Sequence, residues 1–185
     1  NFINVHYRVA AAMLFGTEVK GAYEYDGKEY SGKFAHIPDL NTCSSCHNPH
    51  RLEVALETCV SCHKVDALGD IRTSRVDYDG DGDLAEGISG EIESLHQILR
   101  TAMYTYASEI TGAPVVYAAG TYPYFFNDTN GNGAGEPGES IYPNRYVSWT
   151  PRLLKAAYNY QYIAVDPGAY AHNTHYAIQI LLDSI

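Results

Sequence analysis

The chain has 185 residues, of which 45% are hydrophobic and 18% charged. This length and composition indicate one folded domain and exclude a multidomain enzyme. Twenty-two acidic residues against twelve basic ones give a formal net charge of -10, which argues against a nucleic-acid partner or an anionic membrane surface. The apolar runs are shorter than the roughly 20 residues of a membrane helix, so no membrane span is predicted. Because the chain starts at Asn1 and not at Met, we expect a processed or partial chain that acts outside the cytoplasm.

The periodic segments predict a mainly α-helical fold with extensive irregular loops and a short β-hairpin. The apolar run from Val9 to Phe15 is typical of a helix that ends at Gly16. In residues 23–30, tyrosines alternate with polar residues around an Asp-Gly pair, and this pattern predicts the hairpin. Further helices are predicted over residues 88–107, 151–163 and 174–184.

Two copies of the pattern C-x-x-C-H lie between the first and second predicted helices. Cys43, Cys46 and His47 form the first motif, and Cys59, Cys62 and His63 form the second motif, which together use all four cysteines. The pattern is the attachment signature of c-type haem. Two thiols three positions apart reach the two vinyl groups of one porphyrin, and the histidine that follows binds the iron. We therefore predict two haem c groups, with His47 and His63 as proximal ligands.

A four-thiolate zinc site is the main alternative, because two C-x-x-C pairs also approximate a zinc ribbon. Zinc, however, does not require a histidine directly after each pair. The thirteen residue steps from Cys46 to Cys59 span at most about 45 Å even when fully extended. The two haems are therefore predicted to be neighbours, an arrangement that favours electron transfer over catalysis.

Six histidines remain as candidates for the second axial positions. Five of the eight histidines lie within residues 1–66, and His36 and His50 are the first candidates. His50 follows His47 by three residues, so it points away from its own haem and toward the other one. His6, on an N-terminal arm, competes with His36 and could bind a haem of its own chain or of a neighbouring subunit. Helix packing, capping or hydrogen bonding is the expected role of the other three, His96, His172 and His175.

The segment from Asp128 to Glu139 matches the calcium-loop pattern D-x-[DN]-x-[DN]-G-x5-E without a gap. In such loops, oxygens at positions 1, 3 and 5 converge on the ion, a glycine allows the turn, and the carboxylate at position 12 closes the site. An Asn/Gly-rich turn that only resembles a calcium loop is the alternative. The predicted ligands are Asp128, Asn130, Asn132, Glu136 and Glu139.

A second acidic loop starts at Asp77 with the same spacing, but Ile88 occupies its twelfth position. Residues 77–93 hold seven acidic and no basic residues, so the segment would repel itself without a cation. The closing carboxylate is expected from Glu86 or Glu91, and a solvated acidic turn is the alternative. One or two structural calcium ions are thus predicted, and in this loop the ligands are Asp77, Asp79, Asp81, Asp83 and Glu86.

These motifs resemble the terminal portion of bacterial exported multihaem c-type cytochromes, and the chain is similar to those that form extracellular filaments. The resemblance rests on Cys-Ser-Ser-Cys-His-Asn-Pro-His, the second motif, the run at 77–83, and the segments 149–162 and 166–173. It covers most of residues 1–185. It implies bis-histidine haems and electron transfer, with His36 and His50 matching the F-x-H and C-x-x-C-H-x-x-H elements of the family. Relatives of this type usually carry more than two haems.

We therefore expect a single dihaem domain over residues 1–185, with a haem-binding segment at 1–70 and a calcium-loop and helical scaffold at 71–185. The expected location is extracellular or at the cell surface, with the periplasm as the alternative. Two haems conduct over a distance only if subunits stack, so we expect a homo-oligomer or homopolymer with haem ligation between subunits, together with redox partner proteins. The alternatives are a soluble carrier, a haem reductase or peroxidase with one open iron, and a calcium-dependent adhesion module.

Overall fold

The fold is mainly helical, as the sequence predicted. The computed structural model describes residues 6–51 and 53–185, with side chains from Val9 onward. Four longer helices form the scaffold, and three short helices carry or adjoin the cysteine motifs. The longer helices are α1 (His6–Phe15), α4 (Ile88–Tyr106), α5 (Pro151–Ala164) and α7 (Thr174–Ser184). The short ones are α2 (Cys43–Cys46), α3 (Leu56–His63) and α6 (Ala169–His172).

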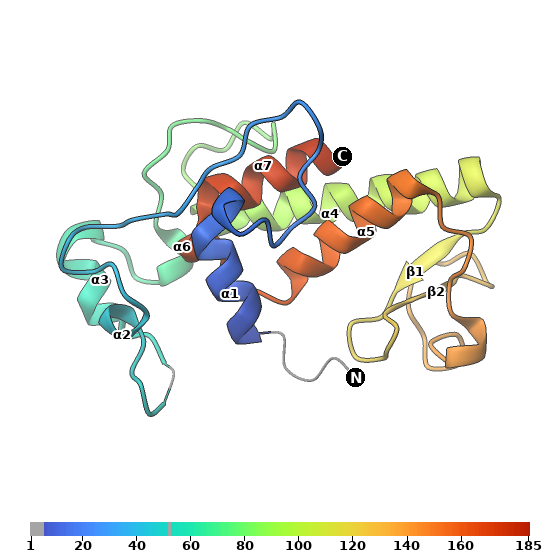
Figure 1. Ribbon diagram of the computed structural model, residues 1–185, viewed down its shortest axis with the longest axis horizontal. Helices are drawn as coiled ribbons and strands as arrows, with labels where there is room; N and C mark the ends of the chain where they lie inside the picture. Colours follow the sequence, from blue (N-terminus) through green and yellow to red (C-terminus); the bar gives the residue numbers. More distant parts are fainter. Residues whose placement is uncertain (1–5, 52) are drawn as a thin grey trace.

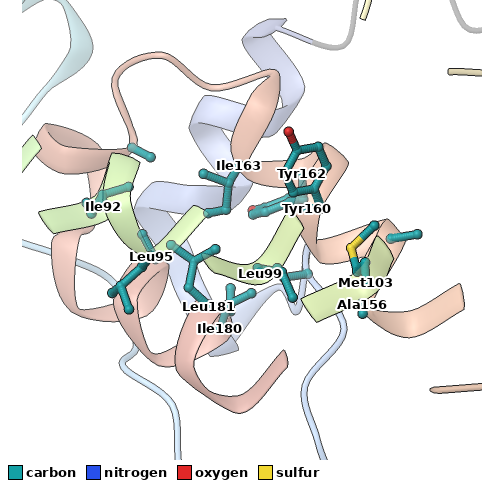
Figure 2. Close-up of a cluster of buried hydrophobic side chains, with 14 of the residues drawn as sticks. Ile92, Leu95, Leu99, Met103, Ala156, Tyr160, Tyr162, Ile163, Ile180 and Leu181 are labelled. Carbon is teal, nitrogen blue, oxygen red and sulfur yellow. The ribbon is translucent and has the colours of Figure 1, made fainter. Parts of the chain in front are cut away.

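The core lies where α4, α5 and α7 pack against one another. Figure 2 shows Leu95 and Leu99 of α4 beside Leu181 of α7, with Tyr160 and Ile163 of α5 closing the cluster. Leu99 and Leu181 have no exposed surface. The spacing of the apolar residues along α4 puts them on one face, which is why this long helix forms the centre of the molecule.

The predicted helix ends are confirmed within one or two residues. Thr150 caps α5 by accepting a hydrogen bond from the Leu153 amide, and Pro151 occupies the first helical position. Asn173 caps α7 in the same way by accepting from the Tyr176 amide. Gly16 follows α1 with a φ of 53°, a conformation that glycine adopts without strain. Among the described residues, no helix combines the length and the apolar character needed to cross a bilayer.

The predicted hairpin lies elsewhere in the chain. Residues 23–30 form a turn at Asp26-Gly27 but no strands. The two-stranded antiparallel sheet is made by β1 (Val115–Tyr117) and β2 (Phe125–Asn127), with Val116 opposite Phe126. This pair lies in a stretch without a clear alternation signal, and its Val and Phe side chains are buried. Burial of apolar side chains therefore decided where the sheet forms.

Residues 23–87 form a segment without a core of its own. None of its described residues is buried. In Figure 1, α2 and α3 lie at one end of the molecule, away from the β1–β2 hairpin at the other end. The start of the segment is held to the scaffold, because the Phe34 amide donates to the Leu14 carbonyl and the Asn173 side chain donates to the Gly32 carbonyl. These bonds fix the chain just before His36.

Candidate haem sites and calcium loops

Each cysteine motif lies on or beside a short helix. Because residues three and four apart share a helix face, Cys43, Cys46 and His47 are placed together by α2, and the second motif is placed together by α3. None of the four cysteines forms a disulfide. The local fold therefore presents two thiols and one imidazole side by side at each motif.

The two motifs lie close to each other. A turn at Pro49-His50 reverses the chain, with the amides of His50 and Arg51 donating to Asn48 Oδ1. The Asn48 amide also donates to the Glu53 carbonyl at 2.8 Å, which closes the loop between α2 and α3. His47 also pairs with Val54 in an antiparallel bridge, which brings the first motif next to the residues that lead into α3. Burial, and then the charge of Cys46, raise the pKa of the Cys59 thiol.

Each motif histidine faces a second imidazole. The ring centres of His63 and His36 are 6.0 Å apart, with an angle of 44° between the ring planes. The ring centres of His47 and His172 are 6.2 Å apart, with an angle of 37°. His36 was a first candidate from the sequence, whereas His172 was expected to cap or hydrogen-bond at a helix end.

The other predicted histidine ligands are placed differently. His50 is exposed on the turn between α2 and α3. His6 begins α1, and its side chain lies outside the described residues. His96 is buried, donates a hydrogen bond from Nε2 to the Tyr160 carbonyl at 2.9 Å, and stacks on the Tyr160 ring. His175 is exposed on α7. The packing role expected for His96 is confirmed.

The loop after β2 has the hydrogen bonds of a calcium loop. Asp128 accepts from the amides of Gly131 and Gly133 through its two carboxylate oxygens. Glu139 Oε1 accepts from the Thr129 amide and hydroxyl and from the Asn130 amide. Glu139 is 6% exposed, and its second oxygen, Oε2, is buried without a hydrogen-bond partner. Since a buried carboxylate oxygen requires a partner, this atom favours a bound cation.

The acidic loop before α4 has the same hydrogen bonds. Asp77 accepts from the amides of Gly80 and Gly82, as Asp128 does from Gly131 and Gly133. Glu91, fully buried on α4, accepts from the amides of Tyr78 and Asp79, as Glu139 does in the other loop. The carboxylates of Asp77, Asp79 and Glu91 lie within 4.8 Å of one another, and so do those of Asp79, Asp81 and Glu86.

In this second loop, Glu91 of α4 occupies the place that the twelfth-position acid, Glu139, has in the other loop. The sequence analysis left Glu86 and Glu91 open for this place and included Glu86 among the predicted ligands. Glu86 is nevertheless near the cluster, and its Oε1 atom is buried without a hydrogen-bond partner. Burial, and then the charges of the neighbouring acids, raise the pKa of Glu86. Asp83 instead accepts from the Ala85 and Glu86 amides at the end of the turn.

Comparison with known proteins gives a full-length similarity. The chain is 28% identical, over its whole length, to the C-type polyheme cytochrome OmcB from two strains of Geobacter sulfurreducens. It is 27% identical, again over its whole length, to the C-type polyheme cytochrome OmcC of the same organism. The chain is a relative of polyhaem c-type cytochromes. It spans about a quarter of the length of these curated relatives, 27% and 26% respectively. No family model and no solved structure matches it.

The residues present in this relative of polyhaem cytochromes fit haem. Two imidazoles that bind one metal from opposite sides, each with a metal–nitrogen bond of about 2 Å, have ring centres roughly 6 Å apart. Both imidazole pairs have this spacing. The segment at residues 23–87 has no buried residue among those described, and a covalently attached porphyrin would supply the core that it lacks. By contrast, no three of the cysteine and histidine ligand atoms among the described residues gather within 4.8 Å, as a four-thiolate zinc site requires.

Proposed function

We propose that the chain is an electron-transfer unit with two covalently bound, closely spaced haem c groups, each held between two histidines. Haem bound at these motifs would supply a one-electron iron couple. The chain supplies four thiols for attachment, imidazoles for the axial positions and a short separation between the two motifs. The observation that carries the proposal is the second imidazole facing each motif histidine.

The pairing of His36 with His63 supports an iron that is closed to substrate at the second motif. His36 faces His63 from the segment that the Asn173 and Leu14 hydrogen bonds fix on the scaffold. A second protein ligand leaves no coordination position for a substrate, and this is the property that separates a carrier from a haem enzyme. Similarity to polyhaem cytochromes over the full chain supports the same function. We therefore infer an electron-transfer protein, exported to the cell surface or to the periplasm, and not an enzyme.

Spectroscopy of the oxidised protein tests this proposal. Intact mass should give two haems per chain, and electron paramagnetic resonance should give low-spin signals alone. Carbon monoxide added after reduction should leave the optical spectrum unchanged. The double variant Cys59→Ser/Cys62→Ser, as a matched control, should keep one haem. A high-spin signal in the unaltered protein, with carbon monoxide binding, would overturn the proposal in favour of a reductase or peroxidase.

We further propose that both acidic loops bind calcium as structural ions. The support is the repeated set of hydrogen bonds and the unpartnered Glu139 Oε2 and Glu86 Oε1 atoms. Calcium prefers six to eight oxygen ligands and tolerates irregular geometry, so carboxylates, amide oxygens and water together can complete each site. Neither loop is flanked directly by an α-helix on both sides, since an irregular stretch precedes the loop before α4 and a strand precedes the loop after β2. This favours a fixed structural role over the opening motion of a calcium sensor.

Filament assembly stays a separate proposal. Two haems on one chain make a short relay, and a longer relay needs the haems of a neighbouring subunit or segment. His6 would be the donor to the next subunit. Electron microscopy and native mass spectrometry of the protein at high concentration test it, because a filament subunit should polymerise and His6→Ala should stop the polymerisation. A protein that stays monomeric, or a His6→Ala variant that polymerises normally, would contradict the proposal.

A further inference from the structure

We propose that His172 is the second axial ligand of the haem at the first motif and that the buried carboxylate of Asp166 positions it. This inference rests on the proposed function and deepens it. The ligand comes from the opposite end of the chain, whereas His50, which lies beside the first motif, was predicted from the sequence to bind the other haem.

The first step is the pairing of the rings. The His172 ring centre is 6.2 Å from that of His47, close to the 6.0 Å between His36 and His63 in the second site. Equal spacing in two independent pairs is expected if both enclose the same kind of metal centre. His50 lies on the exposed turn beside the first motif, where it directly follows Pro49.

The second step is the orientation of the His172 ring. Its Nδ1 atom lies 2.9 Å from both carboxylate oxygens of Asp166, whose side chain has no exposed surface. A carboxylate beside Nδ1 keeps the proton on that nitrogen and leaves Nε2 with the lone pair that binds a metal. Metal-binding histidines commonly have such a partner, which also makes the imidazole a stronger donor.

The third step is the space that the chain leaves for the ring. Gly168 lies against it, and a Cβ atom at this position would be 2.7 Å from His172 Cε1. The Gly168 amide donates to Asp166 Oδ1 at 3.2 Å, so one short turn holds both the carboxylate and the ring. Asn173, which directly follows His172, is 1% exposed and caps α7, and this fixes the end of α6.

The fourth step is the position of α6 relative to the motifs. The short helix α6 packs against α1 and α7, which hold it on the scaffold. His172, on the same short helix, faces the first motif. The helix therefore links the first motif to the core through α7.

The test compares His172→Ala with His50→Ala in the protein that carries its haems. His172→Ala should keep two covalent haems but open one iron, so about half of the haem becomes high-spin and binds carbon monoxide. Added imidazole should restore the low-spin signal, a rescue that an unfolded variant would not show. His50→Ala should leave both signals unchanged. If His50→Ala opens an iron and His172→Ala does not, the assignment is overturned while the proposed function stands. If the unaltered protein already has an open iron, the proposed function itself fails.

Asp166→Asn tests the positioning role. The amide is a weaker partner for Nδ1, so His172 becomes a poorer donor and stabilises ferric iron less. The midpoint potential of one haem should rise, the other should stay unchanged, and both should remain low-spin. Gly168→Ala, which displaces the ring and keeps the carboxylate, should weaken ligation and increase carbon monoxide binding at the same haem. If Asp166→Asn lowers stability without moving either potential, the carboxylate is structural only.

Discussion

At the scale of single residues, His96 shows how burial decides the role of a histidine. It lies between α4 and α5, stacked on Tyr160 with ring centres 3.9 Å apart. Burial lowers its pKa, and the hydrogen bond to the Tyr160 carbonyl offsets only part of that effect. The folded protein therefore holds His96 neutral. As the pH falls, the unfolded chain binds the proton first, so this residue reduces stability below about pH 6.5 and has no such effect at higher pH.

His96→Phe should remove this acid sensitivity. The variant loses the hydrogen bond to Tyr160 and should be less stable by about 1 kcal/mol at pH 8. Between pH 7 and pH 5 its free energy of unfolding should fall less than that of the unaltered protein. Urea unfolding at four pH values measures both quantities. His175→Phe, on the exposed face of α7, is the control and should keep the normal pH dependence. Equal pH profiles for His96→Phe and the unaltered protein would contradict the argument, as would any change in the haem spectrum.

Arg72 neutralises the Glu91 carboxylate at the base of the acidic loop before α4. Its guanidinium forms an ion pair with Glu91, with 8% and 0% of the two side chains exposed. It also donates to the carbonyls of Val76 and Glu86, so it ties the loop to the start of α4. Removal of one partner from a buried pair leaves an uncompensated charge, which is far more costly than loss of an exposed pair.

Arg72→Met should therefore lower the free energy of unfolding by roughly 3–5 kcal/mol. Arg75→Met, three residues away and exposed, is the matched control and should change it by less than about 0.5 kcal/mol. Chemical denaturation of both variants in the same buffer measures the difference. A loss below about 1 kcal/mol for Arg72→Met would show that the loop or a bound cation compensates for the missing guanidinium.

At the scale of elements, the helices were predictable and the hairpin was not. The apolar stripe of α4 and the Thr150-Pro151 start of α5 are local signals, and both helices form where the sequence indicates. The alternation of tyrosines in residues 23–30 is also a local signal. In the folded chain, however, backbone amides of this segment and of the residue after it donate hydrogen bonds to side chains of distant helices. The Tyr23 amide donates to Asn159 Oδ1, and the Ser31 amide donates to Gln179 Oε1. These long-range bonds replace the strand partner that the pattern implied.

The haem ligands divide in the same way. The thiols and proximal histidines follow from C-x-x-C-H because the pattern itself encodes their geometry. His36 could be predicted from the sequence as well, since it lies near the motifs in the chain. His172 was not, because its pairing with His47 depends on how α6 and α7 pack on α1 and α4. Asp166 and Gly168 precede His172 within one short turn, and this acid-glycine-histidine arrangement was the only local signal for it.

The calcium loops give the element-scale prediction. Chelation of calcium should lower the melting temperature, and calcium added back should restore it. Glu139→Gln should weaken calcium binding at the loop after β2, because an amide NH2 group takes the place of Oε2 and the negative charge is lost. The hydrogen bonds to Oε1 can persist. Isothermal titration with calcium chloride measures the loss. Glu109→Gln, an exposed acid outside both loops, is the control and should bind calcium normally. An unchanged melting temperature after chelation would contradict the structural role of calcium.

At the scale of the whole molecule, the scaffold and the haem-binding segment differ in what stabilises them. The scaffold buries apolar side chains between α4, α5 and α7, which stabilises it by about 25 cal/mol for each Å² removed from water. Residues 23–87 contain no buried apolar residue among those described. Two porphyrins between imidazole pairs would give this segment the apolar contacts that its own residues lack. The haems would then act as the second core of the molecule.

Loss of the haems should consequently unfold one part of the chain and spare the other. Replacement of all four cysteines by serine should leave α4, α5 and α7 protected from hydrogen exchange, because their packing does not involve the cysteines. The same variant should lose protection over residues 35–67 and become sensitive to proteases there. Hydrogen exchange with mass spectrometry, compared between this variant and the haem-loaded protein, measures both regions at once. If the cysteine-free chain keeps residues 35–67 protected, the segment folds without a cofactor core, and if α4 also loses protection, the scaffold itself depends on haem.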